Sequence, residues 1–174
     1  MSVPRFCSSY PDAESSVRRN IVKLIVSLAA PLLAGAVGAI ATNPEISGWY
    51  ANLAKPAFSP PNWLFGPAWT TLYILMGVAL FLVWRKGWHI PLVRTAMIVF
   101  GVQLVLNVVW SWLFFGLHSP FTAFLEIIPL WLAIALTGVL FCKVSRPAGV
   151  LLIPYFAWVS FAMALNYAIW SLNR

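Results

Sequence analysis

The sequence alternates between long apolar runs and short polar connectors. A membrane-spanning helix needs about 20 mostly apolar residues, and five runs reach that length: 22–42, 66–84, 92–115, 121–142 and 148–172. Each is continuous, whereas a strand of a membrane barrel needs only about 9–11 residues of alternating polarity. The pattern predicts an all-α bundle of five transmembrane helices. We expect kinks more than breaks at the prolines inside these runs, which are Pro31, Pro129 and Pro154.

Composition excludes a soluble globular domain. The chain has 174 residues, of which 61% are hydrophobic and only 9% are charged, with a mean hydropathy of +0.86. Soluble domains average roughly 45–50% apolar and about 25% charged residues. Residues 1–20 are polar and precede the first run, so we expect a flexible N-terminal tail there and one membrane domain over 21–174.

Basic residues gather in alternate connectors. The tail and the second and fourth connectors carry nine: Arg5, Arg18, Arg19, Lys23, Arg85, Lys86, Arg94, Lys143 and Arg146. The other side of a five-span bundle would hold only Lys55 and Arg174. Positive connectors stay in the cytoplasm. We therefore expect a multi-pass protein of a bacterial cell membrane, with a cytoplasmic N-terminus. The basic residues are explained by the orientation of the spans in the membrane. We therefore expect membrane lipid as a partner and do not expect nucleic acid.

The first connector, residues 43–65, is much the longest and combines four prolines with several aromatic residues. Loops of this length without regular structure are usually functional or disordered. Its aromatic content argues against disorder, and its prolines restrict the unfolded chain. The sequence thus predicts a long ordered loop between the first two helices, covering one end of the bundle.

Three runs carry tryptophan on the same helical face as other distinctive side chains. These faces are Trp69, Tyr73 and Met76; Gln103, Asn107 and Trp110; and Tyr155, Trp158, Ala162 and Asn166. Amides within a span normally face the bundle interior. The spacing therefore predicts an apolar, aromatic-walled cavity with a few amides. An alternative, equally compatible with the spacing, is that the amides only join helix to helix.

Small residues recur every four positions in the first run, as Ala30, Ala34 and Gly38 and as Gly35 and Ala39. Such spacing lets helices approach closely, within one chain or across a homodimer. Other chemistry is sparse. His89 and His118 are far apart and no Cys/His/Asp/Glu cluster supports a metal site. No serine has the partners of a hydrolase, so a conventional enzyme is not expected.

Three stretches together resemble one family. They are WYANLAKPAFSPPNWLFGPAWTTLYILM, QLVLNVVWSWLFFG and IPYFAWVSFAMALNYAIW, and their order and spacing agree with it as well. The chain resembles the TspO/MBR family of tryptophan-rich sensory proteins and translocator proteins, the latter once called peripheral benzodiazepine receptors. The resemblance covers roughly residues 24–173. It implies five helices with a ligand cavity beneath the first loop.

The resemblance implies a receptor or sensor for porphyrins, such as protoporphyrin IX and haem, that regulates tetrapyrrole metabolism or stress responses. It implies no obligatory cofactor. It suggests eleven ligand-binding positions in this chain: Trp49, Tyr50, Pro60, Pro61, Phe65, Trp69, Asn107, Trp110, Trp158, Ala162 and Asn166. Among these, Trp69 and Trp158 are the candidates for photochemistry or direct ring stacking.

Two alternatives remain open under the same resemblance. The protein could degrade porphyrin under light, or it could transport a tetrapyrrole or sterol. The sterol motif of the family requires a basic residue separated from its tyrosine by at most five residues. Here six residues separate Tyr167 from Arg174, so the chain departs from that motif.

Overall fold

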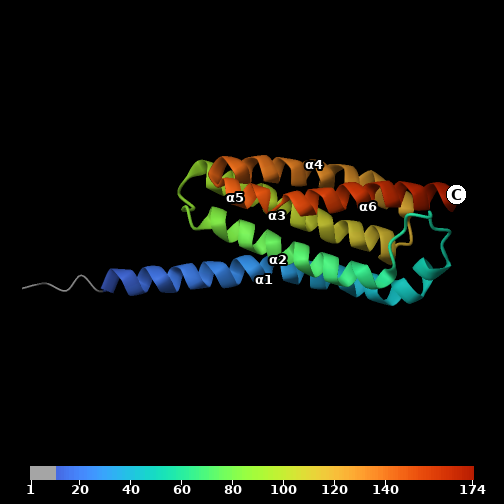
Figure 1. The fold of residues 1–174 in the computed structure, drawn as a ribbon, viewed down its shortest axis with the longest axis horizontal. Helices are drawn as coiled ribbons and strands as arrows, with labels where there is room; N and C mark the ends of the chain where they lie inside the picture. The colour runs from blue at the N-terminus through green and yellow to red at the C-terminus, as the bar shows by residue number, and fades with distance from the viewer. Residues whose placement is uncertain (1–10) are drawn as a thin grey trace, which may run out of the picture.

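The fold is a bundle of five membrane-spanning helical segments, seen in a computed structural model that describes residues 11–174. In chain order the elements are α1 (Pro11–Ser47), α2 (Phe65–Trp84), α3 (Pro91–Ser111) with a π-helical extension η3 (Trp112–Gly116), α4 (Pro120–Val144), α5 (Arg146–Val150) and α6 (Ile153–Leu172). No strand occurs among the described residues. Figure 1 shows the segments side by side. The predicted all-α bundle of five spans is confirmed.

Helix α1 begins earlier than expected. It starts at Pro11, a residue favoured in the first turn because its missing N–H has no helical partner there. Glu14 and Arg18 follow at i, i+4 spacing, which supports a helix in water. Residues 11–20 of the expected tail are therefore helical, and residues 1–10 lie outside the described part. Figure 1 shows α1 projecting past the other helices at this end.

The fifth span is broken where a kink was expected. Pro31 and Pro129 lie inside α1 and α4, whereas Pro154 stands in the first turn of α6, after an interruption at Leu151 and Leu152. Proline cannot donate a hydrogen bond to the carbonyl four residues earlier. The carbonyl of Val150 thus loses its helical partner, and the span divides into α5 and α6.

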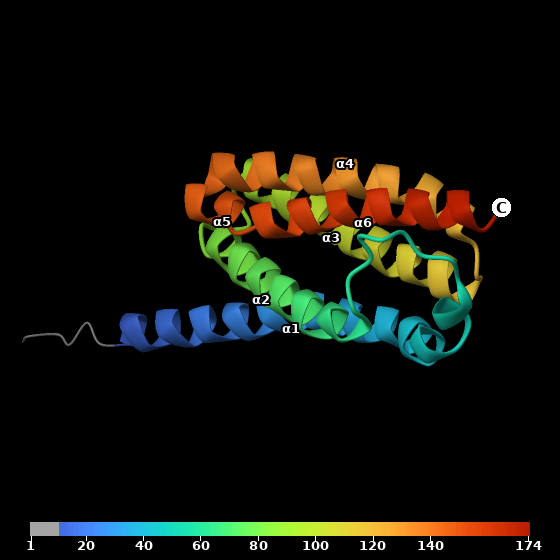
Figure 2. The ribbon, with the colours of Figure 1, turned by 45° about the vertical axis from the view of Figure 1, so that its right-hand side comes forward.

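The bundle core lies mainly between α2, α3, α4 and α6. Met76 and Val83 of α2 are fully buried, and the rings of Phe100 and Phe141 stack across α3 and α4 at 5.6 Å. Helix α1 lies against α2 and α3 on one side, as Figures 1 and 2 show. A Cβ added at Gly77 would lie 2.8 Å from the Cα of Leu28. This glycine therefore permits the close crossing of α1 and α2.

The first connector is ordered, as predicted, although its first five expected residues, 43–47, are the last residues of α1. It contains two short 3-10 turns, η1 (Trp49–Asn52) and η2 (Asn62–Leu64). The side chain of Asn173, just after α6, holds its middle. Its Oδ1 accepts from the N–H of Ala54 at 3.0 Å, and its Nδ2 donates to the carbonyls of Ala54 at 3.0 Å and Ile169 at 2.7 Å. We call this arrangement the Asn173 clasp.

A second contact holds the start of the loop. The imidazole of His118, between η3 and α4, lies 3.0 Å from Glu45 Oε2 and stacks on Trp49 with ring centroids 4.6 Å apart. Tyr50 is 3% exposed and packs against Phe65 and Phe115. The loop is thus secured to α6, to the α3–α4 corner and to the bundle interior.

The described basic residues divide as expected between the two ends. The α2–α3 and α4–α5 turns lie at the same end as the N-terminal part of α1, and the long loop lies at the other (Figure 1). Arg85, Lys86 and Arg146 stand at those turns, whereas Lys55 belongs to the loop. Which end faces the cytoplasm stays a prediction.

Candidate ligand-binding cavity

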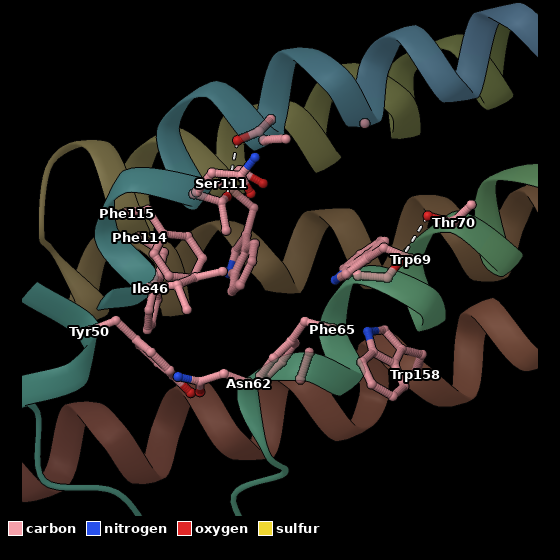
Figure 3. A pocket seen from close by; sticks show the side chains of 18 of the residues that line it. Ile46, Tyr50, Asn62, Phe65, Trp69, Thr70, Ser111, Phe114, Phe115 and Trp158 are labelled. Atoms are coloured by element: carbon pink, nitrogen blue, oxygen red, sulfur yellow. Dashed lines mark hydrogen bonds between the residues drawn. The ribbon is translucent and has the colours of Figure 1, made fainter. Parts of the chain in front are cut away.

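A cavity of about 580 Å³ lies beneath the ordered loop. Its walls come from α1, η1, η2, α2, the end of α3, η3 and α6. Figure 3 shows side chains from these segments converging on one space. Its volume falls within the roughly 300–1,000 Å³ typical of small-molecule sites. The cavity is therefore large enough for a drug-sized ligand.

Aromatic rings form two groups along the cavity wall. On one side, Trp69 stacks on Tyr73 with centroids 5.4 Å apart, and Trp158 meets the Phe65 ring edge-on at 6.2 Å. On the other side lie Tyr50, Phe114 and Phe115 (Figure 3). Rings locked against other rings keep their orientation. The cavity consequently offers preformed flat apolar surfaces.

The amide of Asn166 is engaged by two other helices. Its Oδ1 accepts a hydrogen bond from Trp110 Nε1 at 3.1 Å, and its Nδ2 donates to the Pro120 carbonyl at 2.8 Å. Trp110 also stacks on Phe114 at 5.3 Å. Asn166 thus fixes the indole of Trp110 at the wall, and α6 to the start of α4.

A second amide network lies under the cavity floor. Tyr73 donates from its hydroxyl to Asn107 Oδ1 at 2.8 Å, and Asn107 Nδ2 donates to the Tyr155 hydroxyl at 3.2 Å. Tyr155 in turn donates to Gln103 Oε1 at 2.9 Å. Of the four side chains in this hydrogen-bond network, only Tyr73 lines the cavity. The amides therefore join α2, α3 and α6, as the helix-to-helix alternative supposed, and they do so beside a real cavity.

The structure brings most of the sequence-predicted site residues together. Seven of the eleven line the cavity: Tyr50, Phe65, Trp69, Trp110, Trp158, Ala162 and Asn166. Four do not. Trp49 stacks on His118, Pro60 and Pro61 lie in the loop before η2, and Asn107 lies beneath the floor.

One wall of the cavity was not predicted. It comes from α1, where Gly35, Gly38, Ala39 and Thr42 line the space, and it is joined by Ser111, Phe114 and Phe115. A Cβ at Gly35 would overlap the Tyr73 ring, and one at Gly38 would lie 3.1 Å from Ser111 Oγ. The glycines of the small-residue pattern thus pack within the monomer. That pattern was the available signal for this wall, although a homodimer stays a prediction.

Fold and site together define a class: a five-span helical membrane protein whose aromatic cavity lies under an ordered loop. The model of the TspO/MBR family matches residues 27–171 of the chain. The protein belongs to this family.

Its relatives span archaea, bacteria and animals. The chain is 46% identical over 155 residues to the tryptophan-rich protein TspO of Archaeoglobus fulgidus, covering 88% of this chain and 99% of that one. It is 38% identical over 146 residues to the translocator protein of Homo sapiens, covering 83% and 86%. It is 37% identical over 125 residues to the tryptophan-rich sensory protein of Cereibacter sphaeroides, covering 72% and 77%. The family match over residues 27–171 reaches all five spans.

Proposed function

We propose that the protein is a membrane sensor that binds a porphyrin, such as protoporphyrin IX or haem, and thereby regulates tetrapyrrole metabolism or a stress response. The observation that carries the proposal is the cavity of about 580 Å³ walled by fixed aromatic rings. Membership of a family that includes a tryptophan-rich sensory protein supports the sensory role.

The geometry suits a flat ligand with an apolar body and a polar edge. Trp69, Trp158 and Phe114 present ring surfaces from two sides of the cavity (Figure 3). Aromatic pairs contribute roughly 0.5–1.5 kcal/mol each beyond the burial of area. The exposed lining amides Asn43 and Asn62 lie near the loop, where ligand carboxylates would meet water.

Quenching of tryptophan fluorescence by protoporphyrin IX tests the proposal. Combining Trp69→Ala with Trp158→Ala removes two ring contacts of roughly 0.5–1.5 kcal/mol each, so we expect affinity to fall about 5- to 150-fold. The matched control is Trp112→Ala, since this tryptophan is 45% exposed and does not line the cavity. Unchanged affinity in the double variant would refute the site.

A second candidate is light-dependent degradation of the porphyrin. It is favoured by the stacking of Trp69 on Tyr73, which places two oxidisable rings at the cavity wall. Illuminated and dark samples containing bound ligand separate the two functions. Pigment loss at the same rate as free dye would reject catalysis and leave binding alone.

A further inference from the structure

Part of the cavity wall is exposed on the outside of the bundle. The lining residues from α3, η3 and α6 are all buried or half-buried. Seven lining residues are exposed, and all come from α1, η2 and α2: Leu32, Ala36, Asn43, Asn62, Trp63, Gly66 and Thr70. The exposed wall therefore follows the seam between α1 and the first half of α2 and continues into η2 at the end of the loop.

This seam runs deep into the membrane-spanning region. Ala36 and Leu32 lie about 9 and 15 Å below residue 42, the end of the apolar run, at 1.5 Å rise per residue. The hydrocarbon core of a bilayer is about 30 Å thick. The exposed wall thus extends from the loop end to near mid-depth, where its surroundings are acyl chains.

Away from the loop end, where Asn43, Asn62 and Trp63 lie, the rim of the seam offers lipid no unsatisfied side-chain donor. Leu32 and Ala36 are apolar, Gly66 has no side chain, and the Thr70 hydroxyl donates to the Gly66 carbonyl at 2.9 Å. Below it, α1 and α2 close on each other where Gly77 meets Leu28. The cavity wall along the seam is therefore exposed in the half of the bundle nearer the loop, and α1 and α2 are in close contact in the other half.

The start and middle of the loop are held in place by comparison. The Asn173 clasp ties the middle of the loop to α6, and Tyr50 fills the space beneath it at 3% exposure. Freeing the middle of the loop requires the two hydrogen bonds between Asn173 and Ala54 to break, whereas no side-chain hydrogen bond of the described residues joins α1 to α2 across the seam.

We infer that the cavity exchanges its ligand with the bilayer, through a lateral opening between α1 and α2 bordered by Ala36 and Thr70. The inference rests on the proposed ligand-binding function. The ligand it selects is an amphiphile already dissolved in the membrane, with an apolar body that passes the rim and a polar edge kept near Asn43 and Asn62.

Stopped-flow binding of protoporphyrin IX to proteoliposomes tests the route. In the variant Ala36→Phe with Thr70→Phe, two rings obstruct the rim. Both association and dissociation should slow by about tenfold, because one passage serves both directions. The matched control Val37→Phe adds the same ring at the neighbouring position, which is 44% exposed and does not line the cavity. It should leave both rates unchanged.

The Asn173→Ala variant examines the water-facing side. The lateral route predicts no faster association, since the loop is not the passage. Faster association in Asn173→Ala together with normal association in the Phe variant would overturn the inference. A rise in dissociation alone in the Phe variant would also overturn it, because lost contact accelerates release without obstructing arrival.

A measurement without porphyrin separates this inference from the proposed function. Vesicles of brominated phosphatidylcholine quench tryptophans that their chains approach. The emission of Trp69 is obtained by subtracting the spectrum of a protein that also carries Trp69→Phe. Lipid quenching of this Trp69 emission should be weaker in the Ala36→Phe, Thr70→Phe protein than in the Val37→Phe control. Equal quenching would refute the opening, whereas absent porphyrin binding with unequal quenching would refute only the ligand.

Discussion

Replacement of Tyr155 by phenylalanine should destabilise the bundle out of proportion to the single atom removed. The side chain is 1% exposed, and its hydroxyl accepts from Asn107 Nδ2 at 3.2 Å while donating to Gln103 Oε1 at 2.9 Å. The remaining ring keeps its edge contact with Trp69, whose centroid is 6.2 Å away. The substitution therefore removes one hydrogen bond from each of two buried amide side chains, Asn107 and Gln103.

The magnitude follows from those two groups. Leaving a buried polar group unpaired costs about 1–3 kcal/mol in water-soluble proteins. Hydrogen bonds within membrane spans contribute less, about 0.6 kcal/mol on average and at most about 1.7. Two lost bonds thus give an expected loss of roughly 1–3 kcal/mol for Tyr155→Phe. Tyr73→Phe removes a single bond, to Asn107 Oδ1, and should cost about 0.6 kcal/mol.

The assay is unfolding in mixed micelles titrated with sodium dodecyl sulfate, followed by far-ultraviolet circular dichroism. The free energies of the two single variants and the double variant form a cycle that measures the coupling through Asn107. The reasoning is refuted if Tyr155→Phe costs less than about 0.5 kcal/mol, or no more than Tyr73→Phe.

Three further outcomes are expected. Gly77→Ala places a Cβ 2.8 Å from the Leu28 Cα, so a thermal melt should show a loss of about 1–3 kcal/mol as α1 and α2 separate; an unchanged melting temperature would contradict the close crossing. Trp110→Phe removes the 3.1 Å bond to Asn166 and should weaken porphyrin binding in a quenching titration more than Trp112→Phe does. Burial raises the pKa of the Tyr50 phenol above 10.0, so resistance of the loop to proteolysis should be constant below about pH 10 and fall above it, where the released phenol ionises first; a loss between pH 7 and 9 would contradict this.

The spans could be predicted from sequence because one physical requirement dominates them. Lipid demands long apolar helices, and that demand leaves an unbroken run of residues. The order of the loop was predictable from its mixture of prolines and aromatic residues. The helical start at Pro11 was missed because a polar stretch outside the bilayer is not obliged to be either helix or coil.

The cavity was predictable on the faces that carry distinctive residues, and less so elsewhere. Helical spacing predicted three of its walls, which carry Trp69, Trp110 and Trp158. The α1 wall contains several small residues such as Gly35, which leaves room for the Tyr73 ring because it has no side chain. Which helix such a residue faces depends on packing partners far along the chain.

Residues outside regular helices were the hardest to place. Pro60 and Pro61 were suggested by the family resemblance, yet a matching motif in a loop does not tell which way a side chain points. Asn173 shows the opposite case. It bonds to Ala54 across 119 positions, and no periodic pattern links residues so separated.

The Asn173 clasp also has a consequence for biosynthesis. Residue 54 leaves the ribosome well before residue 173, and the two must meet before the loop can be held in place. During that interval the first two spans can already be inserted, with the cavity still lacking both α6 and a secured cover. The Asn173 clasp therefore forms last. Slow insertion of the final span would leave a nascent chain whose aromatic-lined interior is still open. Such a chain would be vulnerable to membrane proteases and dependent on quality control.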